Sequence, residues 1–198
     1  YRLSIENPEK FWGDFAEQEF VWHKKWDKVL DYDLYKPEIK WFEGAKLNIT
    51  ENCIDRHLES KGEQTAIIFE ANDPNEEALH ITYNQLAQNV NKTANMLKTN
   101  GAKKGDRICL YMPMTPELAY AVLACARIGA VHSVVFAGFS AKSLSDRIND
   151  AECTIVITAD GGYRGSKITP LKEITDEALE SCACVEKVIV LNRTNSKI

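Results

Sequence analysis

The sequence has few glycines, ten in 198 residues, and none of them is arranged as GxGxxG or as GxxxxGK[ST]. Those two patterns mark loops that hold nucleotide phosphates after a strand. No segment combines serine, threonine and glycine at high density. The nearest segment, residues 161–167, contains one serine, Ser166, and does not end in Gly-Lys-Ser or Gly-Lys-Thr. The sequence therefore argues against a self-contained ATP-binding module.

Basic residues are also not in excess. Lysine and arginine number 24 against 29 acidic residues, a formal net charge of −5. A nucleic-acid-binding surface needs a basic stripe that neutralises phosphates, and none is present. No apolar run approaches the roughly 18 residues that span a bilayer, and the charged start YRLSIENPEK does not resemble a signal peptide. We expect no nucleic-acid or membrane partner and a cytoplasmic location.

The six cysteines suggest neither a disulfide framework nor a metal centre, because most of them lie inside apolar runs. The pattern is typical of reduced, buried thiols. Cys182 and Cys184 are separated by one residue, and no second Cys or His pair follows them, so no metal ligands are expected. The six are Cys53, Cys109, Cys125, Cys153, Cys182 and Cys184.

Short β-type runs alternate with helical patterns through the second half of the chain. Near-continuous apolar strands of this kind indicate a parallel sheet covered by helices on both faces. The predicted fold class is therefore α/β, with a parallel sheet flanked by helices. Strands are predicted at residues 107–112, 131–136, 154–158 and 187–191, and helices at 82–100, 115–128, 140–150 and 175–181.

The first 35 residues differ from the rest, because they contain three of the four tryptophans and no evident strand pattern. Their aromatic residues from Phe11 to Trp26 form a roughly helical stripe, and Pro8 suits the first position of a helix. We predict an N-terminal helical extension over residues 1–35 and the start of an α/β domain over residues 36–198. The stripe could be a partner-binding face, but packing on the chain's own domain is the more common use.

Two glycine-containing turns follow predicted strands, in residues 126–140 (ARIGAVHSVVFAGFS) and 153–167 (CTIVITADGGYRGSK). Ligands of α/β sheets sit beyond the carboxyl ends of the strands. The second turn carries Arg164 and Lys167 with Gly165 and Ser166 between them. A guanidinium, an ammonium and backbone N–H groups suit a phosphate. By spacing alone, an ordinary solvated loop remains the more common outcome.

Four segments, residues 1–16, 41–58, 111–140 and 157–179, resemble the acetyl-coenzyme A synthetases of the adenylate-forming ligases, in order and at similar spacing. The resemblance implies part of the large N-terminal domain of such an enzyme. It implies an acetate–CoA ligase that converts acetate, ATP and CoA to acetyl-CoA, AMP and diphosphate through acetyl-adenylate, with Mg²⁺ in the complete enzyme. Synthetases that activate propionate or acetoacetate share a Trp-Phe pair like Trp41–Phe42 and remain an alternative.

The same resemblance places other functional parts of the enzyme beyond Ile198. The phosphate loop, an aspartate that holds the ribose and a lysine on a C-terminal domain are expected to follow there. We therefore expect no catalytic residue within these 198 residues, no activity from this segment alone, and the rest of the enzyme chain as its main protein partner. His57 and His132 are interpreted as structural histidines, since no triad pattern accompanies them.

The resemblance carries over to a coenzyme A site at two places. Phe136, Ala137 and Gly138, with the ring of Phe139, resemble the loop that lies against the 3′-phospho-ADP end of CoA. The turn of Arg164, Gly165, Ser166 and Lys167 resembles the basic turn that meets its phosphates. Many family members have arginine in place of Lys167 and glycine in place of Ala137. Lysine keeps the positive charge but lacks the two parallel N–H donors of arginine, so we expect a similar site with weaker phosphate geometry.

Two other functions stay open from the residues alone. A non-catalytic nucleotide-binding module would bind ATP tightly without the rest of an enzyme. An interaction domain would use the aromatic N-terminus, so that deletion of residues 1–35 would abolish partner binding rather than folding.

Overall fold

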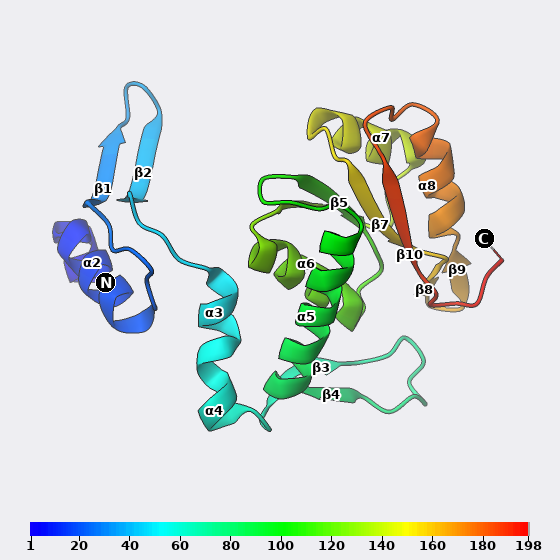
Figure 1. Cartoon of the computed structure of the whole chain (residues 1–198), viewed down its shortest axis with the longest axis horizontal. Helices are drawn as coiled ribbons and strands as arrows, with labels where there is room; N and C mark the ends of the chain where they lie inside the picture. The colour runs from blue at the N-terminus through cyan, green and yellow to red at the C-terminus, as the bar shows by residue number, and fades with distance from the viewer. Residues whose placement is uncertain (198) are drawn as a thin grey trace. The chain divides into compact units, whose positions relative to one another are not determined.

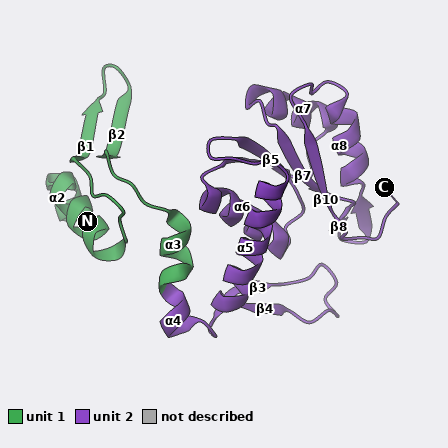
Figure 2. Ribbon diagram, viewed as in Figure 1, with its two compact units in different colours: residues 1–56 green, residues 57–198 purple. Residues whose placement is uncertain are grey.

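The computed structural model describes residues 1–197. They form two compact units, residues 1–56 and the part from residue 57 onwards (Figures 1 and 2). The boundary predicted between residues 35 and 36 falls in the turn of an antiparallel hairpin, inside the first unit. The physical reason is that the residues on both sides of that turn pair with each other and cannot belong to separate units.

The first unit contains a helix, a hairpin and a large aromatic cluster. Helix α2 begins at Pro8 beneath an Asn7 cap, as the proline predicted, but it ends at Glu19. Trp22 and Trp26 therefore lie outside the helix, and the predicted helical stripe is wrong beyond Phe15. The rings nevertheless cluster, because Trp12 packs edge-on against Trp41 of β2, with ring centroids 6.3 Å apart. The helices are α1 Arg2–Glu6, α2 Pro8–Glu19 and α3 Ile49–Cys53.

The hairpin of the first unit, β1 Lys28–Asp33 and β2 Glu38–Glu43, was not predicted. Its sequence KVLDYD has three charged residues in six and no continuous apolar run, so it gives a weak strand signal. The strand is stabilised by pairing with its neighbour, in which Leu30 is buried opposite Trp41. The prediction of a helical extension without a strand over residues 1–35 is therefore wrong at residues 28–33.

The second unit begins with a hairpin and a long capped helix. Strands β3 Thr65–Phe69 and β4 Leu79–Thr82 pair antiparallel, and helix α5 Tyr83–Thr99 follows directly. Thr82 accepts from the backbone N–H of Gln85, while the Gln85 side chain accepts from the backbone N–H of Thr82. This capping box confirms the predicted start of the helix. Preceding these elements are the 3₁₀ turn η1 Asp55–His57 and helix α4 Leu58–Lys61.

A four-stranded parallel sheet forms the centre of the second unit, which confirms the predicted fold class. The apolar runs that predicted its strands are buried: β7 is buried along its whole length and β5 along four of its five residues. In spatial order the strands are β10 Lys187–Leu191, β7 Ile155–Ala159, β5 Arg107–Tyr111 and β6 Val131–Val134.

The direction of each crossover sets which face each helix covers. The step from β5 to β6 moves one way along the sheet, and the steps from β6 to β7 and from β7 to β10 move the other way. Right-handed crossovers therefore place α6 on one face and α7 and α8 on the other. Helix α5 packs against α6, and α7 packs against α8 (Figure 1). These helices are α6 Pro116–Ile128, α7 Ala141–Asp150 and α8 Leu171–Leu179.

The thiols take part in the core rather than in covalent links. All six cysteines are free, and Cys109, Cys125, Cys153 and Cys182 are buried. Burial raises the pKa of the Cys109 thiol to about 12, which keeps it protonated and unreactive at neutral pH. Helix α7 contributes Leu144, which is fully buried in this core beside Val156 of β7.

Leu144 and Leu79 allow a matched test of this packing. Leu144→Ala is expected to lower the free energy of unfolding by about 2–5 kcal/mol, because it leaves a cavity in a fully buried position. Leu79→Ala makes the same chemical change at a residue that is 53% exposed and should cost about 1 kcal/mol or less. Denaturant unfolding of both variants measures the difference, and equal costs would contradict the assigned core.

Candidate functional site

The topology creates a crevice at the carboxyl ends of β5 and β7. Crossovers leave these neighbouring strands in opposite directions, and ligands of open α/β sheets bind at such a switch point. A cavity of about 590 Å³ lies here. It is lined by the segments that follow β5, β6 and β7, together with residues of the β3–β4 loop and Arg193. Of the residues predicted from sequence, Phe136, Ala137, Gly138 and Arg164 line this cavity.

The loop after β6 presents an aromatic ring at the cavity. Phe136 is 63% exposed and packs edge-on against Phe139, with ring centroids 5.6 Å apart. Gly138 permits this placement, since a Cβ at that position would lie 2.4 Å from the Phe136 ring. The buried Tyr111 hydroxyl donates to the carbonyl of Phe139 at 2.8 Å and holds the loop in place. The loop can therefore offer a fixed ring face to a planar ligand.

The basic turn is the tip of a hairpin that the sequence did not predict. Strands β8 Gly162–Arg164 and β9 Lys167–Thr169 pair antiparallel, and Arg164 lies directly opposite Lys167. Side chains of directly opposed residues project from the same face about 5 Å apart, and like charges in that arrangement repel. Both residues are exposed, and neither makes an ion pair with any described residue. An anion between them would relieve the repulsion.

The glycines of this segment serve different purposes. Gly165 has φ +59° at the first central position of the two-residue hairpin turn, which a glycine adopts at little cost. A Cβ on Gly161 would lie 2.7 Å from the Thr194 hydroxyl, so Gly161 permits close packing of the protein on itself.

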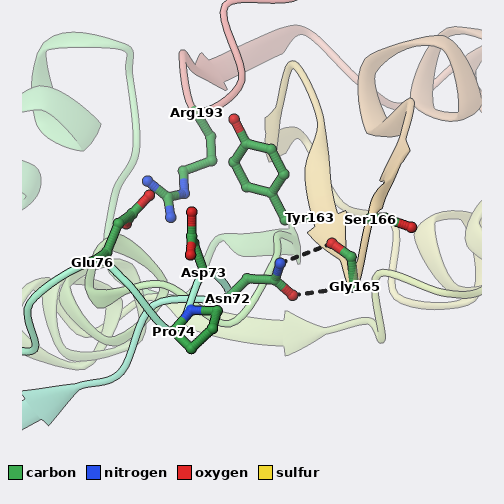
Figure 3. A pocket seen from close by; sticks show the side chains of 8 residues that line it. All are labelled: Asn72, Asp73, Pro74, Glu76, Tyr163, Gly165, Ser166 and Arg193. Atoms are coloured by element: carbon green, nitrogen blue, oxygen red, sulfur yellow. Dashed lines mark hydrogen bonds between the residues drawn. The ribbon is translucent and has the colours of Figure 1, made fainter.

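A second hollow of about 540 Å³ (Figure 3) shares some of its lining residues with the first. Gly165 and Ser166 line this second hollow, and Lys167 lines neither. Six of the seven predicted site residues thus line one or the other of two neighbouring hollows, and Lys167 is the exception. The residues that line both hollows are Asn72, Tyr163 and Arg193, none of which was singled out from sequence.

Asn72 forms a two-point contact with the hairpin tip. Its side-chain NH₂ donates to the carbonyl of Gly165 at 2.8 Å, and its Oδ1 accepts from the N–H of Gly165 at 3.1 Å (Figure 3). The backbone N–H of Gly165, expected from sequence to face a phosphate, is therefore already paired. The two residues are 93 positions apart in the sequence, so no local pattern could predict this contact.

Arg193 adds a third basic side chain to the region. Its guanidinium lies over the ring of Tyr163 at 5.4 Å from the centroid and over Phe69 at 5.9 Å. Within residues 1–197 its guanidinium has no ion-pair partner. Figure 3 shows the guanidinium beside the carboxylates of Asp73 and Glu76, which line the same hollow. Stacking on aromatic faces holds a guanidinium in one plane while its edges remain available to a ligand.

Asp160 secures the segment that carries Arg193. It directly follows β7, is 3% exposed, and accepts from the backbone N–H groups of Gly161, Arg193, Thr194 and Ser196 at 2.7–3.0 Å. Burial alone would raise its pKa, but these four donors favour the carboxylate and lower the pKa from 3.8 to about 2. An acidic residue directly after an apolar strand is a local sequence signal for such a site, although Asp160 was not among the predicted residues.

No histidine lines the site, and the described residues form no metal-binding cluster. Neither His57 nor His132 lines either hollow, and His57 packs against the ring of Tyr83. Across residues 1–197, no group of three or more His, Cys, Asp or Glu side chains is arranged to hold a metal ion. No helix in the same range has the length and apolarity to cross a bilayer.

Family models divide the chain almost where the structure does. The acetyl-coenzyme A synthetase N-terminus model matches residues 1–53, and the AMP-binding enzyme model matches residues 54–197. The chain belongs to the AMP-binding enzyme family.

Relatives within the AMP-binding family align along the whole chain. An acetyl-coenzyme A synthetase 2 from Pseudomonas aeruginosa and an acetyl-coenzyme A synthetase from Magnetococcus marinus are each 56% identical over 198 residues, all of this chain. The chain spans about 30% of the length of these curated relatives. The solved acetoacetyl-CoA synthetase from Streptomyces lividans matches with a TM-score of 0.90 and 26% identity, over 100% of this chain and 30% of that one.

Asp160→Asn tests the role of the buried carboxylate. The variant keeps the size of the side chain but removes the charge that four N–H groups share, and we expect a loss of about 1–3 kcal/mol in the free energy of unfolding at pH 7. Because the folded pKa is lowered, the wild-type stabilisation is complete above pH 4. It falls by on the order of 2 kcal/mol as pH decreases from about 4 to about 2.

Denaturant unfolding from pH 2 to pH 7 measures both effects. The variant should lose this part of the acid dependence as well as stability at neutral pH. Wild-type and variant curves that run parallel over the whole range would show that the carboxylate charge is not stabilised in the folded protein.

Proposed function

We propose that this chain is part of an acetate–CoA ligase that forms AMP. In the first half-reaction an acetate oxygen attacks the α-phosphorus of ATP, diphosphate leaves, and acetyl-adenylate forms. In the second, the CoA thiolate attacks the acyl carbon of the adenylate, the bond to the AMP oxygen breaks, and acetyl-CoA is released. The described residues contribute a surface for the nucleotide end of CoA.

The observation that carries this proposal is the identity to acetyl-coenzyme A synthetases. It reaches 50–56% across all 198 residues in several relatives, and it covers both units of the chain. The acetoacetyl-CoA synthetase of known structure is 26% identical over the same length. Acetate is therefore the favoured acyl substrate, and acetoacetate is the alternative that this structural match supports.

The proposed coenzyme site joins the ring of Phe136 to the cations of the hairpin. Phe136, Ala137 and Gly138 would lie against the adenine, while Arg164 and Lys167 would neutralise phosphate. Arg164 can offer two parallel N–H donors to a phosphate, and the opposed Lys167 adds a mobile point charge. Ser166 adds a hydroxyl at the turn. Gly165 would set the turn rather than donate, because its N–H is paired with Asn72.

ATP and Mg²⁺ belong to the proposed reaction but have no evident site here. The chain contains no phosphate loop, and the described residues do not form a cluster suited to a metal ion. By the same reasoning, a polypeptide limited to these 198 residues should form no AMP.

Acyl specificity tests the proposed reaction. The complete protein that carries this sequence should form AMP from ATP when acetate and CoA are present, with kcat/KM for acetate above that for propionate and for acetoacetate. Coupled measurement of AMP with each acid gives the comparison. A preference for acetoacetate would replace acetate by the alternative substrate, and AMP formation with none of the three acids would contradict the ligase assignment.

Binding of CoA tests the proposed site residues. Arg164→Ala/Lys167→Ala should weaken binding of CoA and of 3′,5′-ADP to the complete protein by about tenfold or more, because two phosphate-facing cations are lost. Isothermal titration calorimetry measures both ligands. Lys92→Ala/Lys98→Ala removes two exposed cations from α5, outside both hollows, and serves as the matched control. Equal affinities for the two double variants would show that the hairpin does not bind the nucleotide.

A further inference from the structure

We infer that Asn72 is a positioning residue for coenzyme binding, which acts by holding the tip of the β8–β9 hairpin so that Arg164 and Lys167 face one phosphate. This inference rests on the proposed function, because it assigns Asn72 a role in the coenzyme site proposed above. Asn72 lies in the β3–β4 loop, far along the chain from the hairpin.

The hairpin needs a stabilising contact from another part of the chain, because its own strands are short. Strands β8 and β9 have three residues each, and the tip residues 163–168 are all exposed. Isolated two-stranded hairpins are marginal in water. At the tip, the opposed cations Arg164 and Lys167 repel each other and have no carboxylate partner among the described residues. Repulsion therefore favours opening of this turn whenever no anion is bound.

Asn72 opposes that opening by bonding a residue at the centre of the turn. It bonds both the N–H and the carbonyl of Gly165, the residue that directly follows Arg164 (Figure 3). Two hydrogen bonds to a single residue fix its position and also its orientation. An amide is the side-chain group that donates and accepts at once in this geometry. Asn72 thus fixes the turn without adding a negative charge beside the phosphate-binding cations.

The neighbouring residue Asn75 provides an internal comparison. It lies in the same exposed loop and bonds Asp73 through its own side-chain amide, and it lines neither hollow. Replacing Asn75 removes the same chemical group from the same loop without touching the hairpin. Any effect specific to Asn72 therefore reports on the contact with Gly165.

The test compares two activities of the complete protein. Asn72→Ala should raise KM for CoA about fivefold, since a loosened turn must be ordered again when the phosphate binds. Acetate-dependent exchange of diphosphate into ATP needs no CoA and should change less than twofold. Asn75→Ala should leave both values at the wild-type level. Hydrogen exchange at the peptide containing Gly165 should become faster in Asn72→Ala, with an unchanged unfolding midpoint.

Arg164→Ala/Lys167→Ala, assayed in parallel, separates failure of this inference from failure of the proposed function. If that variant raises KM for CoA and Asn72→Ala does not, the positioning role is wrong and the coenzyme site stands. If neither variant changes KM for CoA, the coenzyme site is wrong and the inference fails with it. Parallel losses in both half-reactions, or an equal effect of Asn75→Ala, would indicate a merely structural role for the loop and overturn the inference.

Discussion

Four backbone N–H groups converge on the carboxylate of Asp160 at the carboxyl end of β7, and the arrangement of the site depends on that convergence. The segment at residues 193–196 has no regular secondary structure of its own, so its backbone donors need a partner. A buried carboxylate can satisfy several of them at once, and this fixes Arg193 beside Tyr163 and Phe69. One buried charge thus orders both the start of the hairpin and the segment that lies over it.

The two parts of the site are held in place to different degrees. The loop after β6 is held by the Tyr111 hydroxyl and by the packing of Phe136 on Phe139, whereas the hairpin tip is exposed and depends on Asn72. A planar base needs a fixed ring to stack upon. A phosphate can be reached by longer cationic side chains, provided that their backbone is restrained. The division of contacts between the two parts suits a ligand with an aromatic base at one end and phosphates beside it.

Periodic elements of the second unit were predictable because their signals are local. The capping box at Thr82 and Gln85 and the apolar runs of β5 and β7 each lie within a few consecutive residues. The β1–β2 and β8–β9 hairpins were missed because their strands are short or charged and gain stability only through pairing. Helix α8 begins at Leu171, four residues before the predicted start, because burial of Leu171 rather than a strong local signal sets that end.

The sequence by itself determined the α/β class and the family resemblance, and it supplied Phe136, Ala137, Gly138 and residues 164–167 as candidates for the proposed coenzyme site. Those features rest on apolar periodicity and on short segments that can be read in order along the chain. Tertiary structure alone decided that Arg164 opposes Lys167, that Asn72 occupies the N–H of Gly165, and that Arg193 stacks on Tyr163. The contacts of Asn72 and Arg193 join groups that are far apart in the sequence, so no local pattern specifies them. The opposition of Arg164 and Lys167 depends on the register of two strands too short to be recognised on their own.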